Sequence, residues 1–230
     1  MMPISSRITY PALQKDQMVS EIHAIIKKHG WDKFVLVSHS YGSVISTHLI
    51  KSYRTSSLIG PIVLVDPICF LLHLPDVAYN FTARRPVDAN EHQLWYFGSK
   101  DMGVAHTLAR RFSWTENIIW KEDLNLERQD GKEKGRKVTV VLSGQDLIVN
   151  TEAVRQYLLG SSQYTQNVTK NPKTLIGAGS KEEDRSWKKQ WKASGLEVLW
   201  YDTLDHSQVF DSMETRQPIV KAITVYSRMG

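Results

Sequence analysis

The pattern of apolar and polar positions switches between the period of a strand and the period of a helix along most of the chain. Short runs rich in Val, Ile and Leu are separated by segments whose apolar residues recur at helical spacing. The predicted strands are 33–37, 60–65, 137–142 and 196–201, and the predicted helices are 16–29, 43–53 and 151–159. The tail 207–229 is predicted to be largely helical, with a break or restart at Pro218. This order indicates an α/β fold with a mostly parallel sheet flanked by helices.

Two segments do not follow this alternation. The first, 69–130, is long, rich in aromatic residues and helix-like. Sites of open sheets lie at the carboxyl ends of the strands, where such an insertion emerges, so we expect a helical cap; the alternative is an extra helical layer on the sheet. The predicted domains are therefore a core of 1–68 and 131–230 and a cap of 69–130. The polar segment 160–195 contains 181–192, which we interpret as a solvated surface helix rather than a nucleic-acid patch.

Composition and charge fit a globular enzyme domain. The 230 residues are 41% hydrophobic and 23% charged, and the net charge of +5 does not by itself indicate a nucleic-acid partner. Cys69 is the only cysteine, which excludes an intramolecular disulfide and fits a reducing compartment. The N-terminus lacks the pattern of a signal peptide, and the apolar stretch 58–74 is interrupted by Pro, Asp and His. We therefore expect a cytoplasmic protein, or one peripheral to an intracellular membrane, without a membrane span.

The most informative motif is a small–x–Ser–x–Gly sequence that follows the first predicted strand. Its central residue is Ser40, with Ser38 and a glycine on either side. This order places Ser40 on a tight strand–turn–helix, where only small neighbours fit and where the helix start directs N–H groups at the site. We predict that Ser40 is a nucleophile and that the Tyr41 backbone N–H stabilises an oxyanion. Ser38 and Ser43 are the alternative hydroxyls, and Ser43 is more typical of a helix cap.

A serine hydroxyl needs a histidine to take its proton and a carboxylate to orient that histidine. Asp146 follows the third predicted strand and His206 follows the fourth, which gives the chain order Ser, acid, His. Asp66, at the end of the second predicted strand, is the main alternative acid. Asp202 and Asp205 are interpreted as local loop residues.

Other histidines and carboxylates are candidates only for the surroundings of the site. The possible pocket residues are His39, Asp66 and His73, while His92 and His106 belong to the predicted cap. The sequence has no His-Glu-x-x-His, no pair of cysteines and no Gly-x-Gly-x-x-Gly opening a helix, so no metal or cofactor is expected.

These motifs resemble the α/β-hydrolase superfamily, in the branch with a helical cap. The motifs that carry the resemblance are Ser38-His39-Ser40-Tyr41-Gly42, Val65-Asp66-Pro67, Gly144-Gln145-Asp146 and Asp205-His206. The amino-acid sequence of the insertion, from Phe70 to Asn117, is similar to that of a largely uncharacterised group of such proteins common in fungi. The resemblance implies a Ser–Asp–His hydrolase that acts on an ester, thioester, lipid or amide, with a small-molecule or lipid-like substrate. In this family the strand–turn–helix that carries the nucleophile, here Ser40, is called the nucleophile elbow. Serine at the elbow argues against epoxide or haloalkane chemistry, for which the family uses aspartate.

One departure from the family lies before the elbow. Family members have several strands there, and the loop after the third supplies a His-Gly sequence with one oxyanion-hole N–H. Here about one helix precedes 33–37, and no His-Gly occurs upstream of Ser40. Losing one oxyanion donor costs about a hundredfold or more in rate, and 33–37 would form an unpaired, apolar sheet edge. We therefore expect an N-terminally incomplete α/β-hydrolase, with a catalytically impaired protein or interaction module as the alternative to an active enzyme.

Overall fold

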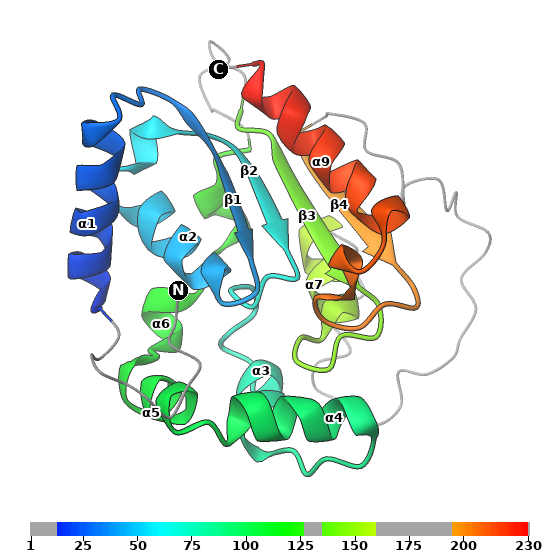
Figure 1. The fold of residues 1–230 in the computed structure, drawn as a ribbon. Helices are drawn as coiled ribbons and strands as arrows, with labels where there is room; N and C mark the ends of the chain where they lie inside the picture. Colours follow the sequence, from blue (N-terminus) through cyan, green and yellow to red (C-terminus); the bar gives the residue numbers. More distant parts are fainter. Residues whose placement is uncertain (1–12, 127–134, 160–194, 230) are drawn as a thin grey trace.

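The computed structural model describes residues 13–126, 135–159 and 195–229, and a parallel sheet lies at its centre. The four strands are β1 (Phe34–His39), β2 (Ile59–Val65), β3 (Val138–Ser143) and β4 (Leu196–Tyr201), in the spatial order β1-β2-β3-β4. Each neighbouring pair is parallel, so all four carboxyl ends meet at one edge, which is the lower edge of the sheet in Figure 1. The predicted mostly parallel α/β fold is confirmed, and each strand lies within two residues of its predicted bounds.

Four helices pack on this sheet. They are α1 (Lys15–Lys28), α2 (Gly42–Lys51), α7 (Thr151–Leu159) and α9 (Met213–Ser227), and short 3-10 turns cover Ser56–Leu58 and Gln208–Phe210. The tail 207–229 is largely helical, as predicted: it contains the 3-10 turn Gln208–Phe210 and then α9, which begins after Ser212 because the Ser212 hydroxyl accepts the Thr215 N–H at 3.2 Å and caps the helix. The predicted break at Pro218 is wrong, since α9 continues through it. Proline removes one backbone N–H and its ring crowds the carbonyl four residues earlier, but the burial of Ile219 and Tyr226 in the core that α9 covers holds the helix.

The strands bury both of their faces, because side chains alternate along them. Ile62, Leu64 and Val140 belong to the core that packs against α1, α2 and α7. Val63 and Val141, one position away, belong to a second core that α9 covers. Since a shift of one residue would exchange these two sets, the register of the sheet is fixed by packing.

Replacing Ile62 by alanine is expected to lower the free energy of unfolding by about 2–5 kcal/mol, because the side chain is fully buried in the central strand β2. Ile25→Ala is the matched control: this side chain is 50% exposed on α1, and we expect a change of about 0.5 kcal/mol or less. Urea denaturation followed by circular dichroism gives both values. Equal effects of the two substitutions would contradict the assigned core.

The segment 69–126 is helical, as predicted. Its elements are α3 (Asp76–Ala78), a π-helix (Tyr79–Ala83), α4 (Ala89–Leu94), a second π-helix (Trp95–Ser99), α5 (Met102–Arg111), α6 (Trp114–Asn117) and a 3-10 turn (Lys121–Leu124). Figure 1 shows α3, α4 and α5 beyond the carboxyl ends of the strands. The Asn80 side chain donates to the carbonyl of Ile148 at 3.0 Å, and Asn150 donates to Asp76 at 3.2 Å. The helical segment therefore contacts the loop that follows β3.

Within the described residues β1 is an edge strand, as the sequence predicts, and Val37 on it is 42% exposed. The predicted polar segment 160–195, with its helix 181–192, lies outside the described residues. Among the helices of the described ranges, none combines the length and the apolar character that crossing a bilayer requires.

Candidate active site

Ser40 lies on the turn between β1 and α2 in a left-handed conformation, with φ of 51°. This conformation costs a non-glycine residue roughly 1–2 kcal/mol, so it persists only where neighbouring contacts fix it. The Ser40 N–H donates to the carbonyl of Val65 at 3.0 Å. The Ser43 hydroxyl donates to the carbonyl of Ser40 at 2.7 Å and accepts the N–H of Ile68 at 3.1 Å. The turn is thus bound to the loop after β2.

The two positions that flank Ser40 in the motif, Ser38 and Gly42, lie close to each other. A Cβ on Gly42 would lie 3.3 Å from the Cβ of Ser38, which is closer than most such contacts. The Ser38 hydroxyl accepts a hydrogen bond from Ser46 on α2 at 2.8 Å. Serine is therefore accommodated where the family motif has glycine. Nothing in the sequence singled out Ser46, because its partner is eight positions away and the contact depends on how α2 packs.

Ser40 and His206 are joined by a hydrogen bond of 2.8 Å between Oγ and Nε2. The other ring nitrogen of His206, Nδ1, lies 2.7 Å from Oδ2 of Asp146. The Asp146 side chain is fully buried and that of His206 is 12% exposed. Oδ1 of Asp146 accepts the N–H groups of Ile148 and Val149 at 2.7 and 2.9 Å. The structure therefore brings the three predicted residues into one chain of hydrogen bonds.

The turn before Asp146 depends on Gly144. A Cβ at this position would lie 2.7 Å from the carbonyl oxygen of Asp202, so only glycine permits the close approach of the two loops. The Gly144 N–H also donates to the carbonyl of Tyr201 at 2.8 Å. This contact holds the loop after β3 against the loop after β4, which carries His206.

Several charges determine the pKa of His206. Burial alone disfavours the charged imidazolium, but the hydrogen bond and charge of Asp146, with smaller contributions from Asp66 and Asp205, leave this pKa raised. A carboxylate on Nδ1 fixes the ring so that Nε2, the nitrogen facing Ser40, is free to accept a proton.

Asp66, the alternative acid, makes no recorded hydrogen bond to His206. Its side chain is fully buried and accepts the Ser143 hydroxyl at 2.8 Å and the Ser207 N–H at 2.9 Å, while burial is the main cause of its raised pKa. Asp205 does more than shape its own loop. Its Oδ1 accepts the N–H of Leu147 at 2.9 Å and that of His206 at 2.6 Å.

His39 lies beside the site, with its ring centroid 5.6 Å from that of His206 and its Nε2 3.0 Å from the Ser207 hydroxyl. Burial, and then the charge of His206, lower the pKa of His39 to about 4, so it is neutral near pH 7. His73 is exposed and its ring lies 5.4 Å from that of Trp120. It does not line the cleft described next.

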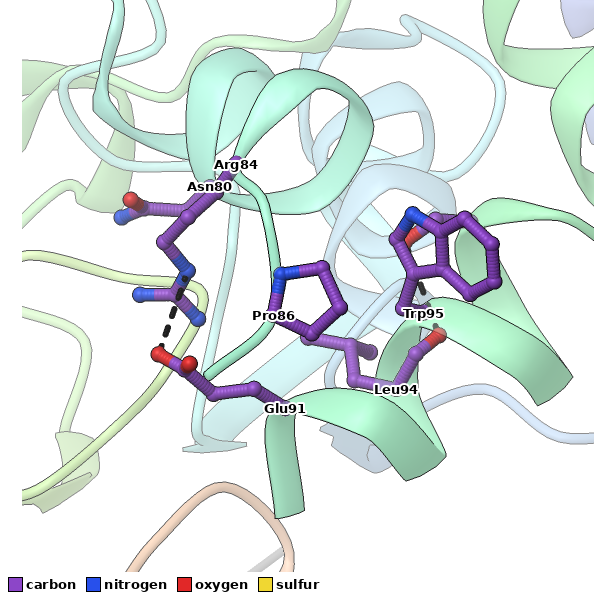
Figure 2. A pocket seen from close by; sticks show the side chains of 7 residues that line it. Asn80, Arg84, Pro86, Glu91, Leu94 and Trp95 are labelled. Carbon is purple, nitrogen blue, oxygen red and sulfur yellow. Dashed lines mark hydrogen bonds and ion pairs between the residues drawn. The ribbon is translucent and has the colours of Figure 1, made fainter. Parts of the chain in front are cut away.

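An open cleft of about 410 Å³ lies beside His206. Leu94 from α4 and Leu147 and Ile148 from the loop after β3 supply its apolar side. Its polar lining consists of Asn90, Gln93, Asp205, Ser207, Gln208 and Asp211. A separate hollow of about 10 Å³ within the helical segment, shown in Figure 2 with the Arg84–Glu91 ion pair of 3.5 Å, is too small for a substrate.

Across the described parts of the chain, no three His, Cys, Asp or Glu side chains gather as a metal site requires.

Comparisons with known proteins bear on the fold. No protein-family model matches the sequence, and no curated protein matches it significantly. An α/β-hydrolase enzyme from the metagenome of sediments of the Mar Chica lagoon, Morocco, superposes with a TM-score of 0.51 at 10% identity, over 98% of this chain and 76% of that one. A hydrolase from Pseudomonas aeruginosa PA01 superposes with a TM-score of 0.51 at 10% sequence identity, over 94% of this chain and 74% of that one. The chain has the α/β-hydrolase fold.

A third structure with this fold, a membrane phospholipase A described as a bacterial virulence factor, gives a TM-score of 0.52 at 9% identity, over 98% of this chain and 67% of that one. In α/β-hydrolases the nucleophile stands on the strand–turn–helix and the acid and base follow later strands. Within the described sheet, Ser40 directly follows β1, Asp146 lies in the loop after β3 and His206 lies in the loop after β4.

Proposed function

We propose that the protein is a serine hydrolase that cleaves an ester, thioester, lipid or amide bond through Ser40, His206 and Asp146. The observation that carries the proposal is the hydrogen-bonded chain from Ser40 Oγ through the His206 ring to Asp146, with bonds of 2.8 and 2.7 Å. Such a chain is what activates a serine hydroxyl, and the left-handed turn exposes that hydroxyl at the carboxyl edge of the sheet.

In the proposed reaction Ser40 Oγ attacks the carbonyl carbon while its proton passes to Nε2 of His206. His206 then gives this proton to the leaving group as the bond to that group breaks, and an acyl-enzyme remains on Ser40. Water attacks the acyl carbon, loses a proton to His206, and the proton returns to Ser40 as the acid product leaves. Asp146 stays ionised throughout and stabilises the imidazolium.

The oxyanion donor in this proposal is the backbone N–H of Tyr41. It follows the nucleophile directly, and the ten-residue helix α2 begins at the next residue, so the N-terminal end of the helix dipole also faces the developing negative charge. The burial of Tyr41 against Phe112, with ring centroids 6.4 Å apart, holds this residue in place.

The proposed substrate has an apolar acyl group. Leu94, Leu147 and Ile148 line the cleft next to His206, and apolar lining favours a hydrocarbon chain. We propose that the predicted insertion 69–130, helical over its described part 69–126, acts as a cap, because Leu94 of α4 contributes to this lining from outside the sheet. The polar residues of the cleft would face the alcohol, thiol or amine side of the scissile bond.

Covalent labelling with a fluorophosphonate tests the proposal. We expect one adduct per chain, mapped by peptide mass spectrometry to Ser40, and its loss in Ser40→Ala but not in Ser227→Ala. Ser227 is the matched control because it is an exposed serine whose hydroxyl donates to the carbonyl of Thr224 at 2.9 Å, near the end of α9 and away from the turn that carries Ser40. A folded chain that gives no adduct would favour the alternative, a catalytically silent protein with this fold.

A further inference from the structure

Asp66 is a buried carboxylate that the proposed mechanism does not use. It lies at the carboxyl end of β2 with φ of 41°, and none of its side chain is exposed. A buried carboxylate is costly unless specific hydrogen bonds compensate it, so its partners indicate why it is there. One partner is Ser143, at the end of β3, and the other is Ser207.

Ser207 directly follows His206 and has φ of 72°, the left-handed region that non-glycine residues avoid. Its N–H donates to Oδ2 of Asp66 at 2.9 Å. The N–H of His206 itself donates to Asp205 at 2.6 Å. Two successive backbone N–H groups at the candidate base are therefore held by two carboxylates from different parts of the chain.

The Ser207 hydroxyl extends this arrangement to the nucleophile. It lies 3.0 Å from Nε2 of His39, which immediately precedes Ser40. Because burial keeps His39 neutral near pH 7, the contact is a bond between uncharged groups. The turn after His206 is thus fixed on one side to Asp66 and on the other to the strand that ends in the elbow.

We propose that Asp66 is a positioning residue for His206: it fixes the left-handed turn at Ser207 and thereby directs the imidazole at Ser40. The inference rests on the proposed hydrolase function. Misplacing a catalytic group by about 1 Å costs about a hundredfold in rate, so a change in this turn is expected to reach the chemistry.

The charge of Asp66 gives the proposal a second readout. The groups that face His206 are Asp146, Asp66, Asp205 and His39, and the first three raise its pKa. His206 must be deprotonated to act as a base. Removing the charge of Asp66 therefore lowers the pKa of His206 and moves the acidic limb of the pH–rate profile to lower pH.

Asp66→Ala and Asp66→Asn separate the two effects. Alanine leaves the Ser207 N–H without its acceptor, so we expect fluorophosphonate labelling to slow by about tenfold to a hundredfold. Asparagine keeps a carbonyl oxygen for that N–H and removes the charge, while its NH₂ group replaces the oxygen that faces Ser143 and can donate to the Ser143 hydroxyl oxygen. Above the midpoint of the acidic limb of the pH–rate profile, we expect the asparagine variant to be labelled at a rate within a few-fold of wild type. The midpoint of that limb is expected at lower pH than in the wild type. Asp123→Asn, a carboxylate that accepts the Trp120 N–H at 2.9 Å away from the site, is the control.

Titration of the His206 ring by nuclear magnetic resonance, assigned against His206→Ala, provides a measurement that needs no activity. A lower imidazole pKa in Asp66→Asn supports the inference. Unchanged labelling in Asp66→Ala, or an unchanged His206 pKa in Asp66→Asn, overturns it. If Asp66→Ala does not fold, the asparagine variant decides alone. A wild-type chain that is never labelled rejects the hydrolase function, while the titration still tests the effect of Asp66 on His206.

Discussion

Replacing His206 by alanine is expected to lower the rate of acyl transfer to Ser40 by about a million-fold, the scale found when the base of a Ser–His–Asp triad is removed. The Ser40 hydroxyl then loses the acceptor of its proton, Nε2 of His206, which lies 2.8 Å from Oγ. An un-ionised serine is a poor nucleophile. The initial rate of fluorophosphonate labelling, and of hydrolysis of a p-nitrophenyl acyl ester, measures the loss.

His106→Ala is the matched control for this prediction. His106 is an exposed histidine on α5 that does not line the cleft, so its removal is expected to leave both rates unchanged. Circular dichroism establishes that each variant is folded. A His206→Ala chain that retains more than about a hundredth of the wild-type rate would mean that another group takes the proton, and the assignment of the base would be wrong.

Asp146→Asn is expected to lower the same rates by about ten-thousandfold while the fold persists. The amide oxygen can still accept the N–H groups of Ile148 and Val149, which Oδ1 of Asp146 now accepts at 2.7 and 2.9 Å. The amide NH₂ then faces Nδ1 of His206, which must be unprotonated to accept it. This forces the proton onto Nε2, the nitrogen that should receive the proton of Ser40.

Asp101→Asn is the control for that substitution, because its carboxylate makes the same local contacts at the start of α5. Its Oδ1 accepts the N–H groups of Gly103 and Val104, both at 2.9 Å. We expect no change in rate and a similar, small change in melting temperature for both variants. A rate within tenfold of wild type in Asp146→Asn would instead assign the role of the acid to a different carboxylate, with Asp66 as the next to test.

The strands and helices could be predicted from the sequence because the patterns that indicate them are local. Apolar runs and helical spacing depend on residues a few positions apart, so β4 and α7 were predicted at their observed bounds. The break expected at Pro218 was wrong, because periodicity does not show that the packing of α9 keeps the helix continuous there. The division into core and cap stays a prediction, although the helical character of 69–126 is confirmed.

Ser40, Asp146 and His206 could be proposed from the sequence because each stands in a short motif next to a strand, and parallel strands bring their carboxyl ends to one edge. The sequence favoured Asp146 because of the Gly-Gln-Asp motif around it, but it left Asp66 as an alternative, since both follow strands. Packing decides their contacts: Asp146 reaches Nδ1 of His206, whereas Asp66 is buried against Ser143 and Ser207.

What the sequence by itself determined is therefore the class of fold and the residue types at the ends of the strands. The tertiary structure alone decided the contacts between loops that are far apart in the chain. Asp205 binding Leu147, Ser207 binding His39 and Ser46 binding Ser38 left no signal in the sequence. Such hydrogen bonds need atoms placed within a few tenths of an ångström, and that placement results from the packing of the whole core rather than from any local pattern.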